Sequence, residues 1–505
     1  MTELSPARRV ALDILLDLEE SGAYARDGLD ASPELRELSR RDAGLATRLV
    51  LGVVATYGCL DELIDTYCEK PGRMNARIRE ALRIAAFEIV YLGTEPRAAV
   101  SQGVELVRTR AKSAAGFANA VLRRIVADRG VYLATEDVPA GSERDTVSAA
   151  RSAGLPAWLA GEVIASLGFE RARLLFGCEL EPAPVAVHLN PHDATAEDVL
   201  AGLRAGASDV AELPGCIAPV ASSELMRTDL LKRSAVAVCD LNAQVVATAA
   251  TMPGDCLEVG AGRGTKSFVM AAQATRCGMR RSAVAVELSK KKNRLNRRRL
   301  ERAGLIDCVC FVTGDGCDLD RALSETDRRA GGRRLFDSVL VDAPCTGTGT
   351  MRRHPEIPWR LLPEDIDRDM PGLQLALLTG AARRVRPGGQ LIYATCSVLQ
   401  QENVAVVDAF LNSEVGRGFA LAPVSQAPIF ERPEFADAAA YVRSQETNRG
   451  LFQTVRARQL RWSFLRPVCP SQNRLAIARA SYCSAQRSEC LLREACGASF
   501  QLLGT

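Results

Sequence analysis

The chain has 505 residues, of which 47% are hydrophobic and 25% are charged, as in an ordinary soluble globular protein of about two to four domains. It contains no run of about 18 apolar residues that could span a membrane, and no signal peptide is evident, so we expect a cytoplasmic protein. The net charge is only +3, but eight arginines and two glutamates follow Val455. These give the tail a charge of +6 and leave the rest of the chain near −3. The positive charge is therefore concentrated, which favours local contacts with an anionic partner.

Cysteine and histidine usage argues against a metal site. The chain has sixteen cysteines and three histidines, but no cysteine pairs at zinc-finger spacing. The cysteines also form no compact framework of the kind found in disulfide-rich secreted domains. We predict free thiols in a reducing compartment and no bound metal.

Residues 1–130 are predicted to form a helical bundle, since few strand signals interrupt the helical spacing. The first helix should begin at Ser5-Pro6, because proline is favoured at the first helical position. Residues 131–182 follow as a helical connector. Further helical patterns cover Leu45–Val54, Ile78–Tyr91, Ala99–Val107 and Phe117–Val126.

From residue 183 the pattern becomes mixed. Residues 183–235 predict a small α/β subdomain with a strand at Val185–Leu189 and a helix over Ala194–Ala205. Residues 236–455 alternate strands with helices, which is typical of a parallel, Rossmann-like sheet covered on both faces. Residues 456–505 show no sustained periodicity and are expected not to pack. The strands of the large sheet are expected at Cys256–Val259, Ala283–Val286, Val309–Val312, Ser338–Val341 and Gln390–Tyr393.

A glycine-rich turn joins the first of these strands to a helix. It reads Glu258-Val-Gly260-Ala-Gly262-Arg-Gly264, and glycines allow a backbone to approach a ligand closely. The G-x-G-x-G spacing, with an acid just ahead, suits a nucleoside with an amino-acid tail better than a dinucleotide. Glu287 and Asp315 end the next two strands, where they could contact ribose hydroxyls and an adenine amino group. A plain strand-to-helix connection explains the glycines alone, but not acids at three successive strand ends.

Two cysteines end the neighbouring fourth and fifth strands, in Asp342-Ala-Pro-Cys345 and Ala394-Thr-Cys396. One such cysteine would usually be a small buried residue, but two over the same crevice favour nucleophilic chemistry. Carbon 5 of cytosine is a poor nucleophile until a thiolate adds to carbon 6. Asp342 is placed to hold the polar edge of the base and to support protonation of ring nitrogen 3. Methylation of adenine or of an exocyclic amine needs no such cysteine.

These motifs resemble those of a known family. Residues 183–455 are similar to the RNA 5-methylcytosine methyltransferases, whose marks are a Pro-Cys and a Thr-Cys dipeptide. Phe117-Ala-Asn119-Ala-Val-Leu-Arg123, with the helices before it, resembles the NusB-like RNA-binding domain. This domain ahead of the methyltransferase is the architecture of the RsmB-type (Sun-type) enzymes that act on small-subunit ribosomal RNA.

The resemblance implies S-adenosylmethionine as cofactor, Cys396 as nucleophile and Cys345 as the residue that assists product release. Arg352-Arg-His-Pro-Glu356 and Gln374 also fit the family pattern. The glycine loop departs from the family's usual Cys-Ala-Ala-Pro-Gly-Gly-Lys, and the family's closing strand is not recognisable after Phe452-Gln-Thr454, through either a reading-frame change near Val455 or a divergent tail. The expected cofactor contacts are Glu258, Gly260, Ala261, Gly262, Arg263, Gly264, Thr265, Lys266, Glu287, Asp315 and Asp342.

The segment Lys290–Arg302 has eight basic residues in thirteen positions on an expected helix. A solvated helix face normally interleaves acids, so contact with RNA phosphates is favoured. The partner expected is small-subunit ribosomal RNA, free or in an early assembly particle, bound by a monomer. Two alternatives stay open: a same-fold methyltransferase acting on tRNA or another RNA, and a catalytically silent RNA-binding assembly factor. The predicted phosphate contacts are Lys290, Lys291, Lys292, Arg294, Arg297 and Arg298.

Overall fold

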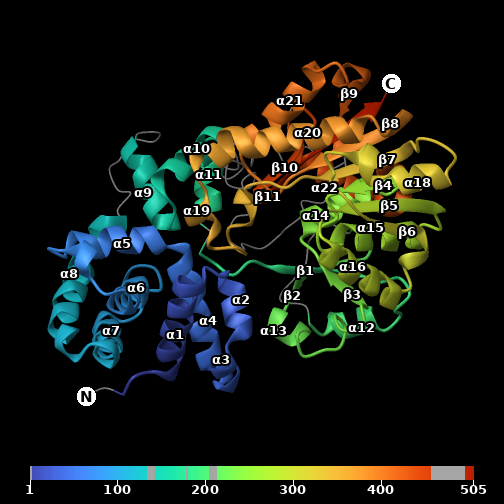
Figure 1. The fold of residues 1–505 in the computed structure, drawn as a ribbon. Coiled ribbons are helices and arrows are strands. Elements are labelled where there is room, and N and C mark those ends of the chain that lie inside the picture. The colour runs from blue at the N-terminus through green and yellow to red at the C-terminus, as the bar shows by residue number, and fades with distance from the viewer. Residues whose placement is uncertain are drawn as a thin grey trace, which may run out of the picture. The chain divides into compact units, whose positions relative to one another are not determined.

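The computed structural model describes residues 3–133, 143–177, 180–203, 213–447, 449–455 and 495–504. The chain divides into two compact units, one of Met1–Pro182 with Thr350–Leu361 and one of Ala183–Gly349 with Leu362–Thr505 (Figure 1). Within the described ranges, no single helix is long and apolar enough to cross a membrane, although α4 (Arg40–Ala55) and α5 (Tyr57–Thr66) pass that test together as a pair bent by 77°. The same residues hold no group of three His, Cys, Asp or Glu side chains arranged as a metal site.

The first unit is helical, as predicted, and α6 is its central helix. Every residue from Glu80 to Val90 is buried, and α6 contacts α1, α4, α5, α7 and α8. The first helix begins at Pro6 and ends at Ser21, and the next residue, Gly22, adopts the left-handed conformation common after helix ends. The helices are α1 (Pro6–Ser21), α2 (Ala25–Ala31), α3 (Pro33–Glu37), α4 (Arg40–Ala55), α5 (Tyr57–Thr66), α6 (Ala76–Val90), α7 (Pro96–Arg110), α8 (Ala115–Leu133), α9 (Glu143–Ala153), α10 (Ala157–Leu167), α11 (Phe169–Phe176) and α19 (Ile357–Arg360).

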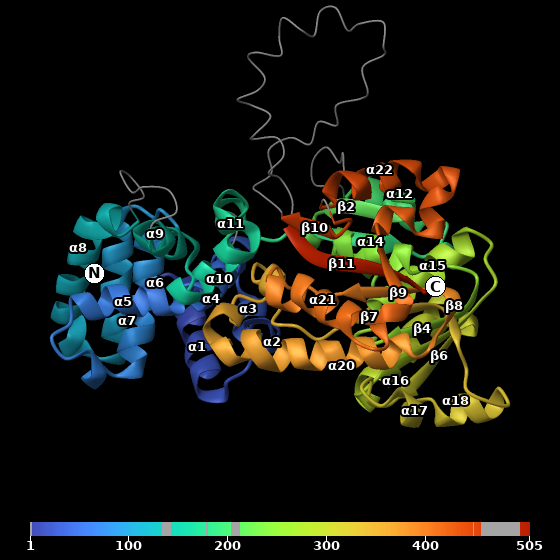
Figure 2. The ribbon, with the colours of Figure 1, turned by 90° about the horizontal axis from the view of Figure 1, so that it is seen from above.

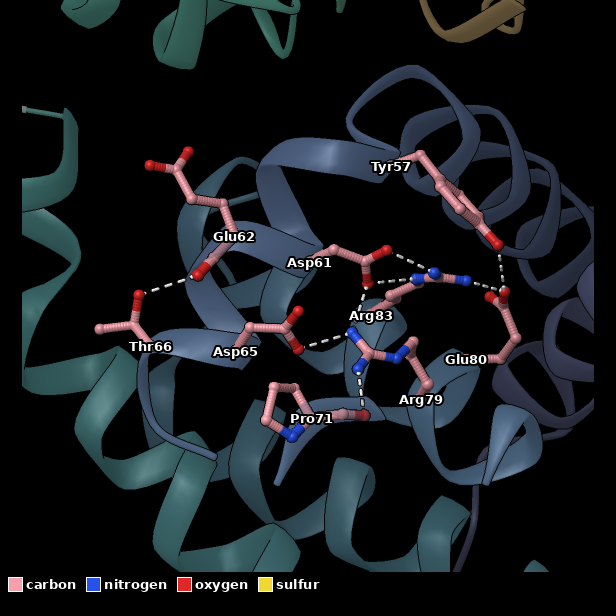
Figure 3. Close-up of polar contacts among 9 residues, drawn as sticks. All are labelled: Tyr57, Asp61, Glu62, Asp65, Thr66, Pro71, Arg79, Glu80 and Arg83. Atoms are coloured by element: carbon pink, nitrogen blue, oxygen red, sulfur yellow. Dashed lines mark hydrogen bonds and ion pairs between the residues drawn. The ribbon is translucent and has the colours of Figure 1, made fainter. Parts of the chain in front are cut away.

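A polar network ties α5 to the buried face of α6 (Figure 3). The Arg83 guanidinium forms two hydrogen bonds with Asp61, at 2.8 and 2.6 Å, and pairs with Glu80. Its Cζ atom lies 3.5 Å from the centre of the Tyr57 ring, and the Tyr57 hydroxyl donates to Glu80 at 3.2 Å. Arg79 joins Asp61 at 3.0 Å. Since a buried charge is costly without partners, this network explains how α6 tolerates Arg83 and Glu80 in its core.

The segment Thr350–Leu361 packs within the helical unit although it lies between two strands of the other unit. The Trp359 indole N–H donates to the carbonyl oxygen of Ala55 at 2.8 Å. A Cβ atom on Gly58 would lie 2.2 Å from the Trp359 ring, so only glycine fits there. Arg26 donates to the Arg353 carbonyl oxygen at 2.9 Å. The family-like Arg352–Glu356 motif is therefore part of this docked segment.

The second unit begins with a small antiparallel sheet in the order β2-β1-β3. Its strands are β1 (Val185–Leu189), β2 (Cys216–Val220) and β3 (Val236–Val238), with α12 (Ala196–Ala201) and α13 (Ser222–Leu225). Because β3 belongs to this sheet, the subdomain continues past its predicted boundary at residue 235. The predicted helix Ala194–Ala205 is shorter, and residues 204–212 lie outside the described residues.

The large sheet has the strand order β10-β11-β8-β7-β4-β5-β6, and β9 pairs with β11. All five predicted strands form, and β4 through β8 are parallel, which confirms the predicted fold class. The chain reverses its direction across the sheet between β4 and β7, where ligands bind in open α/β sheets. The strands are β4 (Gly254–Val259), β5 (Arg281–Glu287), β6 (Val309–Thr313), β7 (Phe336–Asp342), β8 (Val385–Ala394), β9 (Phe419–Ala422), β10 (Phe452–Val455) and β11 (Ala495–Gly504).

Helices cover both faces of this sheet, with α14, α15 and α22 on one face and α20 and α21 on the other (Figure 2). Alternate strand residues enter the two cores: Leu340 and Ile392 face α14 and α22, whereas Val339 and Leu391 face α20 and α21. The helices are α14 (Leu241–Ala249), α15 (Thr265–Arg276), α16 (Lys290–Ala303), α17 (Leu319–Ala322), α18 (Ser324–Arg329), α20 (Met370–Ala382), α21 (Val404–Asn412) and α22 (Ala436–Gln445).

The expectation that residues 456–505 do not pack is wrong for residues 495–504. These residues form β11, which pairs antiparallel with β8, β10 and β9. Leu502 lies opposite Leu391 of β8, so β11 covers a sheet edge that would otherwise leave backbone groups unpaired. Residues 456–494 lie outside the described residues.

We predict that Glu80 makes the free energy of unfolding depend on pH. Burial raises the pKa of Glu80 to about 7, although Arg83 opposes the shift. Between the unfolded value near 4.5 and about 7, the folded chain holds a proton that the unfolded chain releases, so stability falls as pH rises through this window. Glu80→Gln should reduce that loss by about 1–3 kcal/mol.

The measurement is urea unfolding of wild type and Glu80→Gln at pH 5 and pH 7.5. Exposed Glu37 provides a matched control, and Glu37→Gln should leave the difference between the two pH values unchanged. An equal difference in wild type and Glu80→Gln would show that Glu80 is ionised at both pH values.

Candidate active site

The glycine loop lies at the carboxyl end of β4, and all three of its glycines have positive φ angles: 83° at Gly260, 55° at Gly262 and 69° at Gly264. A Cβ atom on Gly260 would lie 2.3 Å from the carbonyl oxygen of Asp342, and one on Gly264 would lie 2.6 Å from Asn296. These two glycines are therefore required by the packing of the protein itself. A Cβ on Gly262 would meet only the Gly260 carbonyl oxygen, at 3.8 Å. Gly262 thus borders open space, as expected of a loop that receives a ligand.

Glu287, at the end of β5, lies against this loop. Its carboxylate accepts hydrogen bonds from the backbone N–H groups of Gly262 at 2.8 Å and Ser289 at 2.9 Å. The side chain is buried, and its position beside the loop matches that of an acid that receives ribose hydroxyls. The structure therefore brings the predicted glycine and acid contacts together.

Lys266 and Asp342 connect the glycine loop to the cysteines. Lys266 lies in the first turn of α15, and its Nζ is 2.7 Å from the Asp342 carboxylate at the end of β7. Burial lowers the pKa of Lys266, but the Asp342 carboxylate more than compensates and raises it. Lys266 therefore stays charged and holds Asp342 at the end of β7. Asp342 is the residue predicted to contact the polar edge of the target base.

Two other predicted cofactor contacts are differently placed. Glu258 is buried within β4 and accepts a hydrogen bond from the Ser267 hydroxyl at 2.5 Å, and burial raises its pKa to about 7. This carboxylate contributes to holding α15 on β4. Asp315 follows β6 and is exposed, and its carboxylate accepts from the Cys317 N–H at 2.9 Å. Neither contact to a cofactor is tested by these positions, so both stay predictions.

The two cysteines meet because β7 and β8 are paired, with Asp342 opposite Ala394. The Cys345 and Cys396 sulfur atoms are 3.0 Å apart, and the Cys396 N–H donates to the Cys345 sulfur at 3.3 Å. Because the Cys345 thiol can donate to a Cys396 thiolate, the pKa of Cys396 is lowered and that of Cys345 is raised. Lys266 adds to the lowering at Cys396. The pair therefore favours one thiolate, on Cys396, beside one thiol, on Cys345.

Polar residues that sequence reasoning missed surround the two cysteine loops. The Thr348 hydroxyl lies 3.0 Å from the Ser397 hydroxyl and accepts from the Val398 N–H at 3.1 Å. Glu402 and Asn403 are also buried here. No periodicity marks these residues, and the only available signal was their position just after Cys345 or Cys396.

The predicted basic helix α16 lies beside the glycine loop. Its buried face includes Asn296, whose amide donates to the Gly262 carbonyl oxygen at 3.0 Å, and Asn293, which donates to the Val312 carbonyl oxygen at 2.9 Å. Lys292 lies 3.7 Å from Glu287. Side chains predicted to contact phosphate are all exposed on this helix, namely Lys290, Lys291, Lys292, Arg294, Arg297 and Arg298.

Comparisons with known proteins identify two matching families, related proteins and a structure of the same fold. A model of the 16S rRNA methyltransferase RsmB/F family matches residues 250–430, and a model of the NusB family matches residues 5–127. The "Ribosomal RNA small subunit methyltransferase B" of Thermus thermophilus is 30% identical over 415 residues, covering 80% of this chain and 87% of that protein. The "Probable ribosomal RNA small subunit methyltransferase B" of Bacillus subtilis is 29% identical over 412 residues, covering 80% and 88%. The crystal structure of PH0851 shares the fold, with a TM-score of 0.65 and 18% identity over 99% of both chains.

We predict that Gly262→Leu weakens binding of S-adenosylmethionine by about 100-fold or more, equivalent to roughly 2.7 kcal/mol, because the new side chain would fill the open space beside the loop. Gly278 offers a matched control. It also has a positive φ angle, 63°, and no atom lies within 4 Å of its Cβ position, but it lies beyond the end of α15. Isothermal titration calorimetry should show wild-type affinity for Gly278→Leu. Equal affinities of the two variants would contradict the assignment of the loop.

Proposed function

Because this chain belongs to the RsmB/F family of S-adenosylmethionine-dependent RNA 5-methylcytosine methyltransferases, we propose that it methylates a cytosine of small-subunit (16S) ribosomal RNA, with Cys396 as the nucleophile. The observation that supports this reaction is the 3.0 Å approach of the two sulfur atoms, beside Asp342 and the glycine loop. The names of its relatives support the choice of RNA. We further propose that it acts as a monomer in the cytoplasm, on free RNA or an early assembly particle.

In this reaction a thiolate must add to the cytosine ring before the methyl group can be transferred. The Cys396 thiolate adds to carbon 6 of cytosine, ring nitrogen 3 takes a proton from solvent, and the displaced electron pair makes carbon 5 nucleophilic. S-adenosylmethionine supplies the electrophilic methyl group that carbon 5 then attacks. Asp342 is placed to hold the nitrogen edge of the base while that proton is present. Lys266 keeps Asp342 in position.

Release of the product is the role we assign to Cys345. Once Cys396 is bonded to carbon 6 it carries no negative charge, so it no longer opposes ionisation of the Cys345 thiol. Cys345 can then pass its proton to solvent and accept the proton from carbon 5. The electron pair of that C–H bond restores the ring double bond and expels Cys396 as a thiolate, while nitrogen 3 loses its proton.

Two alternative functions predict experimental results that differ from those of this proposal. A same-fold enzyme on another RNA would show the same chemistry with a different substrate. A catalytically silent assembly factor would bind RNA without either cysteine, but the paired sulfur atoms and the lowered pKa of Cys396 favour an active site.

We predict that replacing each of the two cysteines blocks the reaction at a different step. Cys396→Ala should transfer no methyl group and form no RNA adduct, because the ring is never activated. Cys345→Ala should accumulate a protein–RNA adduct that survives a denaturing gel and disappears in the double variant. The assay follows labelled methyl transfer from S-adenosylmethionine to a 16S transcript, with a tRNA pool in parallel.

Cys310, an exposed cysteine of β6, is the matched control, and Cys310→Ala should match wild type in both readouts. Full activity of Cys396→Ala would falsify the proposed mechanism. Transfer to tRNA and not to the 16S transcript would leave the mechanism in place and replace the substrate.

We also propose that the exposed face of α16 contacts RNA phosphates. Replacing three of its arginines with glutamine should weaken binding of the 16S transcript. It should also reduce the slope of log affinity against log salt concentration by roughly 2 to 3, since each phosphate contact contributes about 0.7 to 0.9 to that slope. The measurement is RNA affinity by filter binding over a range of salt concentrations. The variant changes Arg294, Arg297 and Arg298, and the control changes the exposed Arg328, Arg329 and Arg333.

The control triple variant removes the same charge from α18 and its neighbouring loop, so it should largely retain the wild-type slope. If both triple variants reduce the slope of the salt dependence equally, α16 contributes only to the electrostatic potential of the whole protein and makes no phosphate contact of its own.

A further inference from the structure

Glu402 is a buried carboxylate that lies against the Cys345 loop, in the 3-10 turn Gln400–Glu402. One carboxylate oxygen accepts hydrogen bonds from the Thr346 N–H at 2.8 Å and from the Gln374 amide at 3.0 Å. The other accepts from the Thr346 hydroxyl at 2.5 Å. Three hydrogen bonds offset the cost of burying a carboxylate. A buried carboxylate with this many partners, all on or near the Cys345 loop, points to a role in holding that loop.

Gln374 extends this set of contacts to the other side of Cys345. Its amide nitrogen donates both to Glu402 and to the carbonyl oxygen of Pro344, the latter at 2.9 Å. The residues before and after Cys345 are therefore both held, one through Gln374 and one directly by Glu402. This leaves the Cys345 side chain few positions other than the one beside Cys396.

Asn403, the next residue, holds the other cysteine loop in the same way. Its amide oxygen accepts from the Thr395 hydroxyl at 2.7 Å, and its amide nitrogen donates to the Ser397 carbonyl oxygen at 2.9 Å. Thr395 and Ser397 are the two neighbours of Cys396. Adjacent residues of one turn thus fix the flanks of both cysteines.

We propose that Glu402 is a positioning residue of this reaction: together with Gln374 it holds Cys345 within reach of Cys396, so that Cys345 can complete release of the RNA adduct. Asn403 holds the nucleophile loop on the same turn. The proposal rests on the proposed function for its account of release, but the effect of Glu402 on the cysteine pair can be tested without RNA.

The charge of Glu402 has a separate effect that distinguishes it from its hydrogen bonds. The groups that face Cys396 are Cys345, Asp342, Lys266 and Glu402. The hydrogen bond from Cys345 lowers the pKa of Cys396, and Lys266 lowers it further, whereas burial, Asp342 and Glu402 raise it. Removing only the charge of Glu402 should therefore let Cys396 ionise at lower pH.

Three variants separate the hydrogen bonds of Glu402 from its charge. Glu402→Gln keeps an oxygen for Thr346 and Gln374 but removes the charge, whereas Glu402→Ala removes both. Thr346→Val removes the bond from the hydroxyl to Glu402, together with a longer 3.4 Å contact to the Ser397 hydroxyl, so it tests the same Glu402 contact if Glu402→Ala fails to fold. Glu414, exposed after α21, is the control as Glu414→Ala.

The first measurement is single-turnover methylation of the 16S transcript, with the adduct quantified on denaturing gels. Glu402→Ala should slow adduct release by about 10- to 100-fold, as expected for a misplaced reacting group, and Thr346→Val should slow it less. Glu402→Gln should release the adduct far faster than Glu402→Ala. Wild-type release rates in both Glu402→Ala and Thr346→Val would overturn the proposal.

The second measurement uses no RNA: the rate at which iodoacetamide alkylates Cys396 is followed by mass spectrometry as a function of pH. Glu402→Gln should shift the profile to lower pH, and Glu414→Ala should match wild type. An unchanged profile in both Glu402→Gln and Glu402→Ala would show that Glu402 does not act on the cysteine pair. If wild type alkylates as expected but methylates no RNA, the proposed function fails while the position of Glu402 relative to the cysteines stands.

Discussion

The parallel pairing of β7 with β8 is the contact on which the site depends. Asp342 lies opposite Ala394, so the two loops that follow these strands leave the sheet side by side and at the same height. In a parallel sheet, a shift of one residue would turn the side chains to opposite faces, and the two sulfur atoms could not meet. The order β7-β4 on the other side of β7 adds the glycine loop to the same edge. One strand thus connects the two cysteines to the glycine loop.

Local patterns in the sequence were sufficient to predict the fold and where most of the candidate site residues lie in it. The five parallel strands are largely buried apolar runs, although β6 at the sheet edge exposes Cys310. The glycine loop and the strand-end acids lie at or just after the ends of these strands, so their positions could be derived from strand order alone. The charges of α16 were equally visible, because exposed basic side chains need no distant partner to be recognised.

The features that the sequence did not reveal depend on contacts between distant segments. β11 joins β8 across more than a hundred residues of chain, and no local period marks a strand that completes a sheet from so far away. Glu402 resembles any other acid in a polar turn until Thr346 and Gln374 are seen to surround it. Trp359 lies in a loop between strands, but its partners, Ala55 and Gly58, precede it by some three hundred residues.

The placement of Thr350–Leu361 has a consequence for how the protein can be divided. The chain passes from the helical unit to the sheet unit, returns for this one segment and then leaves again. A truncation at residue 182 would therefore not isolate a complete catalytic module, because it would remove the packing partners of Trp359, which follows Cys345 by fourteen residues. A simple fusion of a helical domain to a methyltransferase would have one connection between the two domains. Here the two parts are interleaved, so a transplanted catalytic domain would also require the matching surface around Ala55 and Gly58.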